Sequence, residues 1–384
     1  MNRTVRLWPI LVLLAGCAGP PAPLPQPVPP APPPIGGGPP QVTFEAVAFD
    51  RLDGWTADDL AQSLPALRAS CGRLTQLAPS QTLGPSGLGG LAGDWLAPCG
   101  ALRRVADADR LAVRAYFEEW FQPYRVKADG SSQGKFTGYF EPELRGSRQP
   151  DGRFKVPLYG LPPGQANDPP TFTRAEIEAG ALKGRGLELL WVDDAIDAHI
   201  LHIQGSGKVR MTDGSIVQVG YAGNNGRPFV GLGQILFDEG KLPSKGTMIE
   251  IRAWLEAHPA EAPALMAKNP RFVFFRLLTG PGPIGAEGVA LTPGRSLAVD
   301  PRFIPLGVPL WLDTSDAFGR PFRRLMVAQD AGKAITGPIR GDVFWGSGDA
   351  AFDQAGRMKS SGTYYILLPR QRSGPVAALE GSTG

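Results

Sequence analysis

The chain has 384 residues, enough for two domains, and its 42% of hydrophobic residues can fill a sizeable core. Its 39 Lys and Arg nearly balance its 36 Asp and Glu, and no basic run stands apart, so we expect no nucleic-acid partner. Fifty glycines and forty prolines, spread among short Val, Ile and Phe runs, predict a mainly β chain with some helices.

Residues 1–17 have the features of a secretion signal: two arginines, a short apolar run, and small residues before Cys17. The apolar run is too short to span a membrane. The stretch Leu-Ala-Gly-Cys at its end resembles the bacterial lipobox, which implies a signal peptide that ends at an acylated Cys17. Because Ala18 and not Asp follows, we expect an outer-membrane lipoprotein that faces the periplasm of a Gram-negative bacterium. An ordinary signal peptide with an incidental cysteine is the alternative.

Residues 18–42 are dominated by proline and contain a run of three glycines. Such a composition predicts an extended polyproline II linker, because it offers few side chains that could form a packed core. A tether for an anchored enzyme is one interpretation, and a linker with no length requirement is the other.

Helical patterns follow at residues 58–70 and 107–121. Cys71 and Cys99 are the only cysteines besides Cys17, and in an oxidising compartment they most simply form a disulfide. His199 and His202 lie in a stretch, residues 193–210, that reads as an alternating strand, where an i, i+3 pair points to opposite faces. We therefore expect no metal site.

The middle of the chain alternates strands and turns, with one longer helix. Residues 235–258 are predicted as this helix, with Ser244 as a cap near its middle. One expected strand region is residues 193–210, whose alternating pattern runs into the turn Gln204–Gly207. The other expected strands are residues 215–220, 269–276 and 289–300.

The segment FTGYFEP, residues 136–142, contains aromatic and acidic groups suited to binding sugars. Tyr139 can stack on a sugar ring and Glu141 can bind sugar hydroxyls. A core β-hairpin is the alternative, and it is as good an explanation for Phe140.

Three aspartates recur at strand ends in the last third of the chain. Asp300 precedes the Pro301 turn in LAVDPRFIPLGVPLWL, and Asp330 and Asp342 lie in MVAQDAGKAITGPIRGDVFWGSG. Glycines beside the two later aspartates predict positive φ or close approach to a ligand. The alternative is that all three aspartates serve only as turn residues.

These residues carry a resemblance to a known family. The run D-A-G-x-A-I-x-G-x-x-R-x-D-x-F-x-G, preceded by Asp300, resembles the three-aspartate segment of the membrane-bound lytic murein transglycosylase A family. Four more segments resemble the same family, and together the matches span about residues 136–368: FTGYFEP, QGSG, YAGNNGRP and NPRFVFFR.

The resemblance implies a double-psi β-barrel domain with N-terminal helices, with a second β domain inserted into it. Mapped onto this sequence, the barrel takes residues 43–137 and 270–369, and the inserted domain takes residues 138–269. The groove between them binds glycan. Residues 370–384 form a flexible tail.

The implied reaction is cleavage of the β-1,4 bond between N-acetylmuramic acid and N-acetylglucosamine in peptidoglycan, with formation of 1,6-anhydromuramic acid ends during cell wall turnover. Asp342 corresponds to the catalytic aspartate, acting first as acid and then as base. Asp330 and Asp300 are supporting groups. The expected substrate-binding residues are Tyr139, Glu141, Gln204, Ser206, Tyr221, Asn224 and Arg340.

Two other functions remain open at this stage: a glycan-binding barrel of the expansin-like kind without catalysis, and a hydrolase in which a second carboxylate activates water. The ends of the product distinguish them. We expect no cofactor, because the sequence contains no nucleotide or metal motif. The expected partners are peptidoglycan glycan strands, the outer membrane, and a cell-wall synthesis or division complex.

Overall fold

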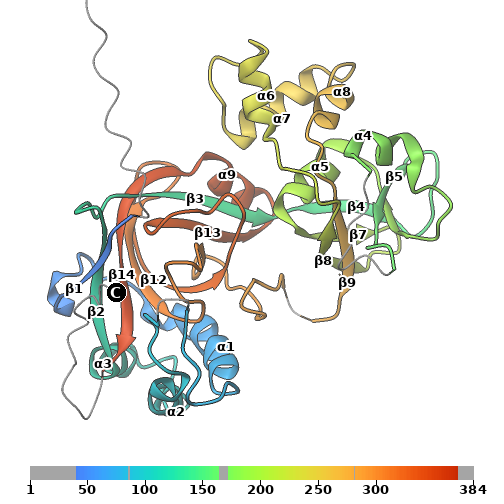
Figure 1. Cartoon of the computed structure of the whole chain (residues 1–384). Helices are drawn as coiled ribbons and strands as arrows, with labels where there is room; N and C mark the ends of the chain where they lie inside the picture. The colour runs from blue at the N-terminus through green and yellow to red at the C-terminus, as the bar shows by residue number, and fades with distance from the viewer. Residues whose placement is uncertain (1–39, 85–86, 164–171, 281, 371–384) are drawn as a thin grey trace, which may run out of the picture. The chain divides into compact units, whose positions relative to one another are not determined.

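The computed structural model describes residues 40–84, 87–163, 172–280 and 282–370 (Figure 1). The predicted signal peptide, the acylated Cys17, nearly all of the linker and the tail from residue 371 lie outside the described residues. Within the described ranges, none of the helices has both the length and the apolar character needed to cross a membrane.

Eight strands form the first sheet, in the order β1-β2-β14-β11-β12-β10-β13-β3. The N-terminal half of β14 also pairs with β3, so six strands from β14 to β3 close into a barrel. Figure 1 shows these strands curving around one another. The strands are β1 (Val42–Ala46), β2 (Phe121–Ala128), β3 (Gly134–Glu141), β10 (Ser296–Val299), β11 (Pro309–Ser315), β12 (Pro321–Asp330), β13 (Arg340–Ser347) and β14 (Lys359–Pro369).

The barrel is filled by nearly continuous apolar runs, as expected for strands that are buried on both faces. All four residues of β10 and the first four of β11 are buried. Trp311 of β11 is fully buried and meets Trp55 edge to face, with ring centroids 5.3 Å apart. The barrel core and the N-terminal helices thus form one hydrophobic cluster.

The N-terminal helices lie against one end of the barrel (Figure 1). Cys71 of α1 and Cys99 of α2 form a disulfide. Helix α3 begins at the N-cap Asp109, whose carboxylate accepts hydrogen bonds from the N–H groups of Leu111 and Ala112. The elements are η1 (Phe49–Arg51), η2 (Leu60–Ser63), α1 (Leu64–Leu74), η3 (Ala92–Trp95), α2 (Leu96–Leu102) and α3 (Arg110–Trp120).

Six strands form the second sheet, in the order β5-β6-β4-β7-β8-β9. Pro142 alone separates β3 of the barrel from β4 of this sheet. The strands are β4 (Glu143–Ser147), β5 (Val156–Tyr159), β6 (Glu188–Val192), β7 (Ser206–Met211), β8 (Ile216–Asn224) and β9 (Val273–Leu278). The mainly β architecture with two sheets predicted from the sequence is confirmed.

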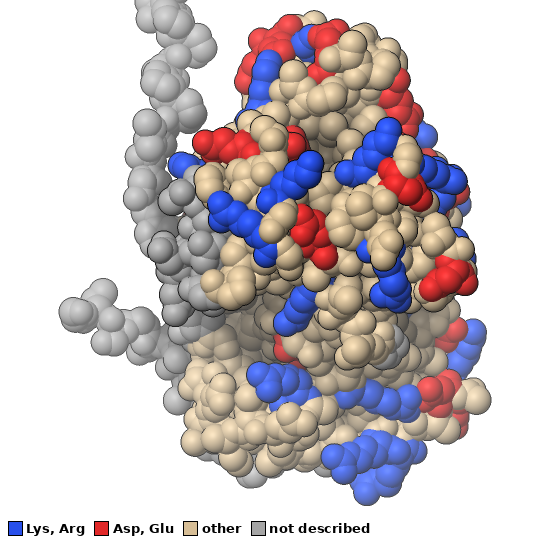
Figure 2. Space-filling view, turned by 90° about the vertical axis from the view of Figure 1, so that its right-hand side faces the viewer, with Lys and Arg blue, Asp and Glu red and all other residues tan. Residues whose placement is uncertain are grey.

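The remaining helical elements follow β5, with three of them (α6 to α8) sharing a small core of their own. They are α4 (Arg174–Glu176), η4 (Ile177–Ala181), α5 (Ala195–Gln204), α6 (Leu232–Asp238), α7 (Met248–Ala257), α8 (Ala262–Ala267) and α9 (Asp349–Arg357). On the face shown in Figure 2, Lys and Arg are interspersed with Asp and Glu over its upper part, while Lys and Arg predominate along its lower part.

Two elements differ from the sequence prediction. The stretch predicted as a strand through His199 and His202 is helix α5, so the two histidines lie on neighbouring positions of one helix face. Asp194 caps this helix at its N-terminus, and Gly205 in the left-handed conformation ends it. These two end signals outweigh the apparent alternation.

The predicted single helix over residues 235–258 is also wrong, because α6 and α7 are separate and Ser244 lies in the turn between them. Thr247 is the cap of α7, in a reciprocal capping box with Glu250.

The second sheet also reaches further along the chain than predicted. We placed the end of the inserted domain at residue 269, which assigns the following strand to the barrel. However, β9 pairs with β8 through an antiparallel register from Val273 to Leu278. Its residues Val273 and Phe275 belong to the core of the second sheet. The boundary therefore lies after Leu278.

Candidate active site

A groove of about 840 Å³ is lined by residues of both sheets. The barrel contributes β3, the end of β12, the β12–β13 loop and β13, and the second sheet contributes α5, β7, β8 and β9. Asp330 and Asp342 are the only acidic residues among its described lining residues. The structure thus brings together two of the three predicted aspartates.

Strand β13 places Asp342 between two neighbours of the barrel. Asp342 is opposite Ala298 of β10 on one side and Thr137 of β3 on the other. Gly341 precedes it because a Cβ there would lie 2.9 Å from Phe136 and 3.0 Å from Leu297. Its φ is not positive, so close packing rather than turn geometry requires this glycine.

Burial raises the pKa of Asp342 to about 6. The hydroxyl of Thr137 donates a hydrogen bond to Oδ1 of Asp342, and this bond and the charge of Arg340 both lower the pKa. The negative charge of Asp330 acts in the opposite direction. A carboxyl group in this balance can hold a proton in mildly acidic solution and release it during a reaction.

Asp330 ends β12 and is held by three hydrogen bonds. The Tyr139 hydroxyl donates to its Oδ2 at 2.8 Å, and the N–H groups of Ala286 and Ala331 donate to its Oδ1, each at 2.9 Å. Burial raises the pKa of Asp330, while these three bonds oppose that effect. The ring of Tyr139 also packs on Phe344, with centroids 5.2 Å apart.

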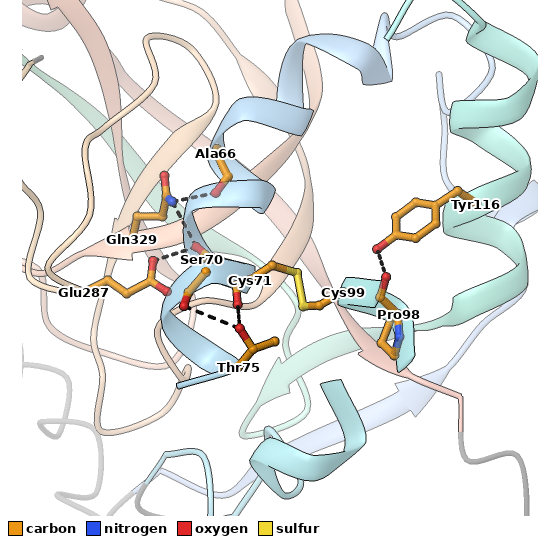
Figure 3. Close-up of a disulfide and its surroundings, with 10 residues drawn as sticks. Ala66, Ser70, Cys71, Thr75, Pro98, Cys99, Tyr116, Glu287 and Gln329 are labelled. Atoms are coloured by element: carbon orange, nitrogen blue, oxygen red, sulfur yellow. Dashed lines mark hydrogen bonds between the residues drawn. A yellow bond between two sulfur atoms is a disulfide. The ribbon is translucent and has the colours of Figure 1, made fainter. Parts of the chain in front are cut away.

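The loop that carries Ala286 is joined to helix α1 through a buried polar cluster (Figure 3). Ser70 of α1 donates to Oε2 of Glu287 at 2.7 Å, and the amide of Gln329 donates to Ser70 at 2.9 Å. The N–H of Glu287 in turn donates to the carbonyl of Gln329. The disulfide begins at the next residue, Cys71, so the cross-linked helix supports the segment around Asp330.

Asp300 does not line the groove. It forms a salt bridge with Arg302 at 2.6 Å and accepts a hydrogen bond from the N–H of Gly337 at 2.7 Å. Burial would raise its pKa, but the bonds from Arg302 and Gly337 outweigh that effect and hold the pKa below the usual range. The bond from Gly337 attaches the β12–β13 loop to Asp300, at a point outside the groove.

Five of the seven predicted substrate-binding residues line the groove: Tyr139, Gln204, Ser206, Tyr221 and Arg340. The other two do not. Asn224 donates to the Tyr221 hydroxyl at 2.5 Å and so orients a groove residue. Glu141 is buried, and its carboxylate lies 3.3 Å from the ammonium of Lys208, which also donates to Ser347.

Thr137 was missed by the sequence analysis, although a signal for it was present. It lies two positions before Tyr139 in the same strand, and alternate residues of a strand share a face. The Ala286 contact to Asp330 had no such signal, because it joins a loop residue to the end of a strand 44 positions away. Among the described residues, no group of three or more His, Cys, Asp or Glu side chains could hold a metal ion.

Comparison with known proteins gives a consistent result. Residues 135–276 match the MltA specific insert domain and residues 295–368 match the 3D domain. Membrane-bound lytic murein transglycosylase A of Vibrio cholerae is 36% identical over 249 residues, which cover 62% of this chain and 67% of the relative.

Two solved structures are similar over most of the chain. The lytic transglycosylase LtgG of Burkholderia pseudomallei is 42% identical with a TM-score of 0.62, and the match covers 87% of this chain and 98% of that one. Escherichia coli MltA with bound chitohexaose is 29% identical with a TM-score of 0.67, and the match covers 87% of this chain and 96% of that one. On its sequence and its fold, the chain belongs to the membrane-bound lytic murein transglycosylase A family.

Proposed function

We propose that this protein is a lytic transglycosylase that cleaves the β-1,4 bond between N-acetylmuramic acid and N-acetylglucosamine in peptidoglycan. The observation that carries the proposal is the groove with the carboxyl group of Asp342, whose pKa is raised to about 6 by burial. Family membership supplies the reaction class, since the relatives are named lytic murein transglycosylases.

In the proposed first step, protonated Asp342 donates its proton to the glycosidic oxygen as the bond from that oxygen to the anomeric carbon breaks. The oxocarbenium-like muramoyl residue is then attacked at that carbon by its own C6 hydroxyl. The carboxylate of Asp342 takes the hydroxyl proton, which returns the acid to its starting state. The products are a 1,6-anhydromuramoyl end and a free hydroxyl on N-acetylglucosamine.

Asp330 is poorly suited to be a second catalytic group. A hydrolase needs a further carboxylate that is free to accept a proton from water. Both oxygens of Asp330 already accept hydrogen bonds, from Tyr139 on one side and from Ala286 and Ala331 on the other. We therefore assign Asp330 to the support of the site and to the tuning of the Asp342 pKa.

Replacement of the proposed acid tests this function. Asp342→Asn should leave a folded protein that binds chitohexaose but releases anhydromuropeptides about 10² to 10⁴ times more slowly, the usual contribution of a general acid. Asp349→Asn, an exposed aspartate at the start of α9 outside the groove, is the matched control and should act as the unaltered protein does. Near-normal release by Asp342→Asn would remove Asp342 from the mechanism.

We also propose a location in the cell envelope. The relatives are named membrane-bound, and the sequence supplies one attachment point, the predicted acylation of Cys17. A lipid anchor in the outer membrane, followed by the proline-rich linker, would hold the catalytic part near peptidoglycan. A cell-wall synthesis or division complex is a further partner that this location would permit.

A further inference from the structure

The groove is lined by an excess of positive charge. Its described lining contains five basic residues, Arg174, Arg271, Arg276, Lys333 and Arg340, and only two acidic ones, Asp330 and Asp342. In the active form Asp342 is protonated and carries no charge. A neutral sugar chain has no charge to balance that of such a lining, whereas an anionic ligand has.

Two of the five cations already bind groups of the protein itself. Arg174 is buried and forms a salt bridge with Glu178 at 3.0 Å. Arg340 donates to the Thr137 hydroxyl at 2.8 Å and to two backbone carbonyl groups. These two side chains hold the walls of the groove.

The other three cations have no acidic partner. Within the described parts of the chain, no carboxylate lies within salt-bridge distance of Arg271, Arg276 or Lys333. Arg276 and Lys333 are exposed, and Arg271 is half-buried. Their charges are therefore available to a ligand in the groove.

The three cations come from both parts of the groove lining. Arg276 lies on β9, where it pairs with Gly220 of β8 in the second sheet. Lys333 lies in the β12–β13 loop of the barrel, three residues after Asp330. A ligand that fills the groove therefore meets cations from both sheets.

The turn that carries Arg271 is rigidly built. The buried guanidinium of Arg174 donates to the carbonyl groups of Asn269 and Arg271, at 3.2 and 2.8 Å. Asn225, also buried, donates to the carbonyl of Pro270 at 2.8 Å. Because the backbone is fixed in this way, less ordering is needed when the Arg271 side chain binds a ligand.

From these observations we infer that Arg271, Arg276 and Lys333 form a carboxylate-binding site, which recognises the acidic substituent on the muramic acid residues of the substrate. This inference rests on the proposed function, because it concerns the same groove. The carboxylate has two sources, the lactyl group of muramic acid itself when no peptide is attached, and the peptide stem when one is. Chitin oligosaccharides carry neither.

Binding measurements with three ligands test the inference. The full-length Asp342→Asn protein in detergent is titrated with chitohexaose, with glycan strands stripped of peptides by an amidase, and with peptide-bearing strands of matched length. The asparagine prevents cleavage and resembles the protonated acid. We expect at least one of the two anionic strands to bind more tightly than chitohexaose, with an advantage that shrinks as salt is added.

Charge removal should then act selectively. Adding Arg271→Gln, Arg276→Gln or Lys333→Gln should weaken binding of the anionic strand about 1.4- to 5-fold each, the usual range for an exposed ion pair, and leave chitohexaose unchanged. Arg103→Gln, an exposed cation after α2 outside the groove, is the matched control. Tight binding of stripped strands would assign the lactyl carboxylate, and tight binding of peptide-bearing strands alone would assign the stem.

Equal binding of all three ligands, or an equal loss for chitohexaose in the three variants, would overturn the inference. Neither result would touch the proposed function, which is read separately from the anhydromuropeptides that the unaltered protein releases. If the unaltered protein released none, the proposed function would fail, while the binding comparison would still decide whether the site selects carboxylates.

Discussion

The neighbours of Asp342 shift its pKa in opposite directions, and the direction of each shift follows from the contact. Burial and the charge of Asp330 raise the pKa of Asp342, while the Thr137 hydroxyl and Arg340 lower it. Bond cleavage needs the protonated acid, so the rate should fall as pH rises through about 6. The alkaline limb of the pH profile for cleavage therefore reports the pKa of Asp342.

Asp330→Asn should move this limb to lower pH. Removal of the negative charge takes away one cause of the raised pKa, so Asp342 loses its proton earlier. The optimum should become more acidic, with a smaller effect on the maximum rate. Release of anhydromuropeptides is measured across pH, with thermal melting in parallel. An unmoved profile with a lower melting temperature would leave Asp330 as a purely structural residue.

Thr137→Val should move the same limb in the opposite direction. Valine is branched at Cβ as threonine is, but it lacks the hydroxyl that donates to Asp342. Without this bond the carboxylate is less stable, so the pKa rises and the protonated acid persists to higher pH. The same assay over pH measures it. A downward shift in Thr137→Val would show that the hydroxyl does not stabilise the charged form.

Glu287 joins the loop before β10 to helix α1, through the hydrogen bond from Ser70. Burial raises the pKa of Glu287 to about 7, from an ordinary value of 4.5. The folded protein thus binds a proton more tightly than the unfolded chain does. Glu287 consequently favours unfolding as pH rises from about 4.5 through 7, by on the order of 3 kcal/mol once the group is fully ionised.

Glu287→Gln should therefore raise the melting temperature at pH 8 and change it little at pH 5. The glutamine keeps an oxygen that can accept the bond from Ser70 but carries no charge. Thermal unfolding at the two pH values measures the difference. Equal melting temperatures of the variant and the unaltered protein at pH 8 would mean that the buried carboxylate is better solvated than its surroundings indicate.

The elements also show which parts of the fold the sequence could predict. Strand β10 was predicted within residues 289–300, and Asp330 and Asp342 were expected at strand ends, because apolar runs and turn residues are local signals. Helix α5 was predicted as a strand because its residues also alternate in polarity, although Asp194 and Gly205 are a helix cap and a helix end signal. Thr247 and Glu250 form a capping box that the sequence shows, whereas the predicted cap, Ser244, lies between the two helices.

The site was predictable only where its residues lie within sequence motifs. Asp330 and Asp342 were found together in one glycine-punctuated stretch, and five of the expected substrate-binding residues line the groove with them. The contacts of Ala286 with Asp330 and of Ser70 with Glu287 join residues far apart in the sequence. No periodicity reports such pairs, because they exist only after the chain has folded.

At the scale of the whole molecule, we expect the protein to depend on Cys17 for its attachment. Cys17→Ala should give a protein that no longer partitions with outer-membrane lipid, because the substitution removes the thiol that the predicted acylation requires. Membrane fractionation measures it, with release of anhydromuropeptides by the detergent-solubilised variant as the control for folding. A variant that stays firmly in the outer membrane would point to a protein partner as the anchor.

We claim that the muramic acid hydroxyl, and not water, attacks the anomeric carbon. Digestion of purified peptidoglycan in water enriched in heavy oxygen, followed by mass spectrometry of the released muropeptides, tests it most directly. The proposed reaction predicts 1,6-anhydromuramoyl ends without any heavy oxygen, because no atom of water enters the product. Reducing ends that carry the heavy oxygen would contradict the claim and identify the protein as a hydrolase.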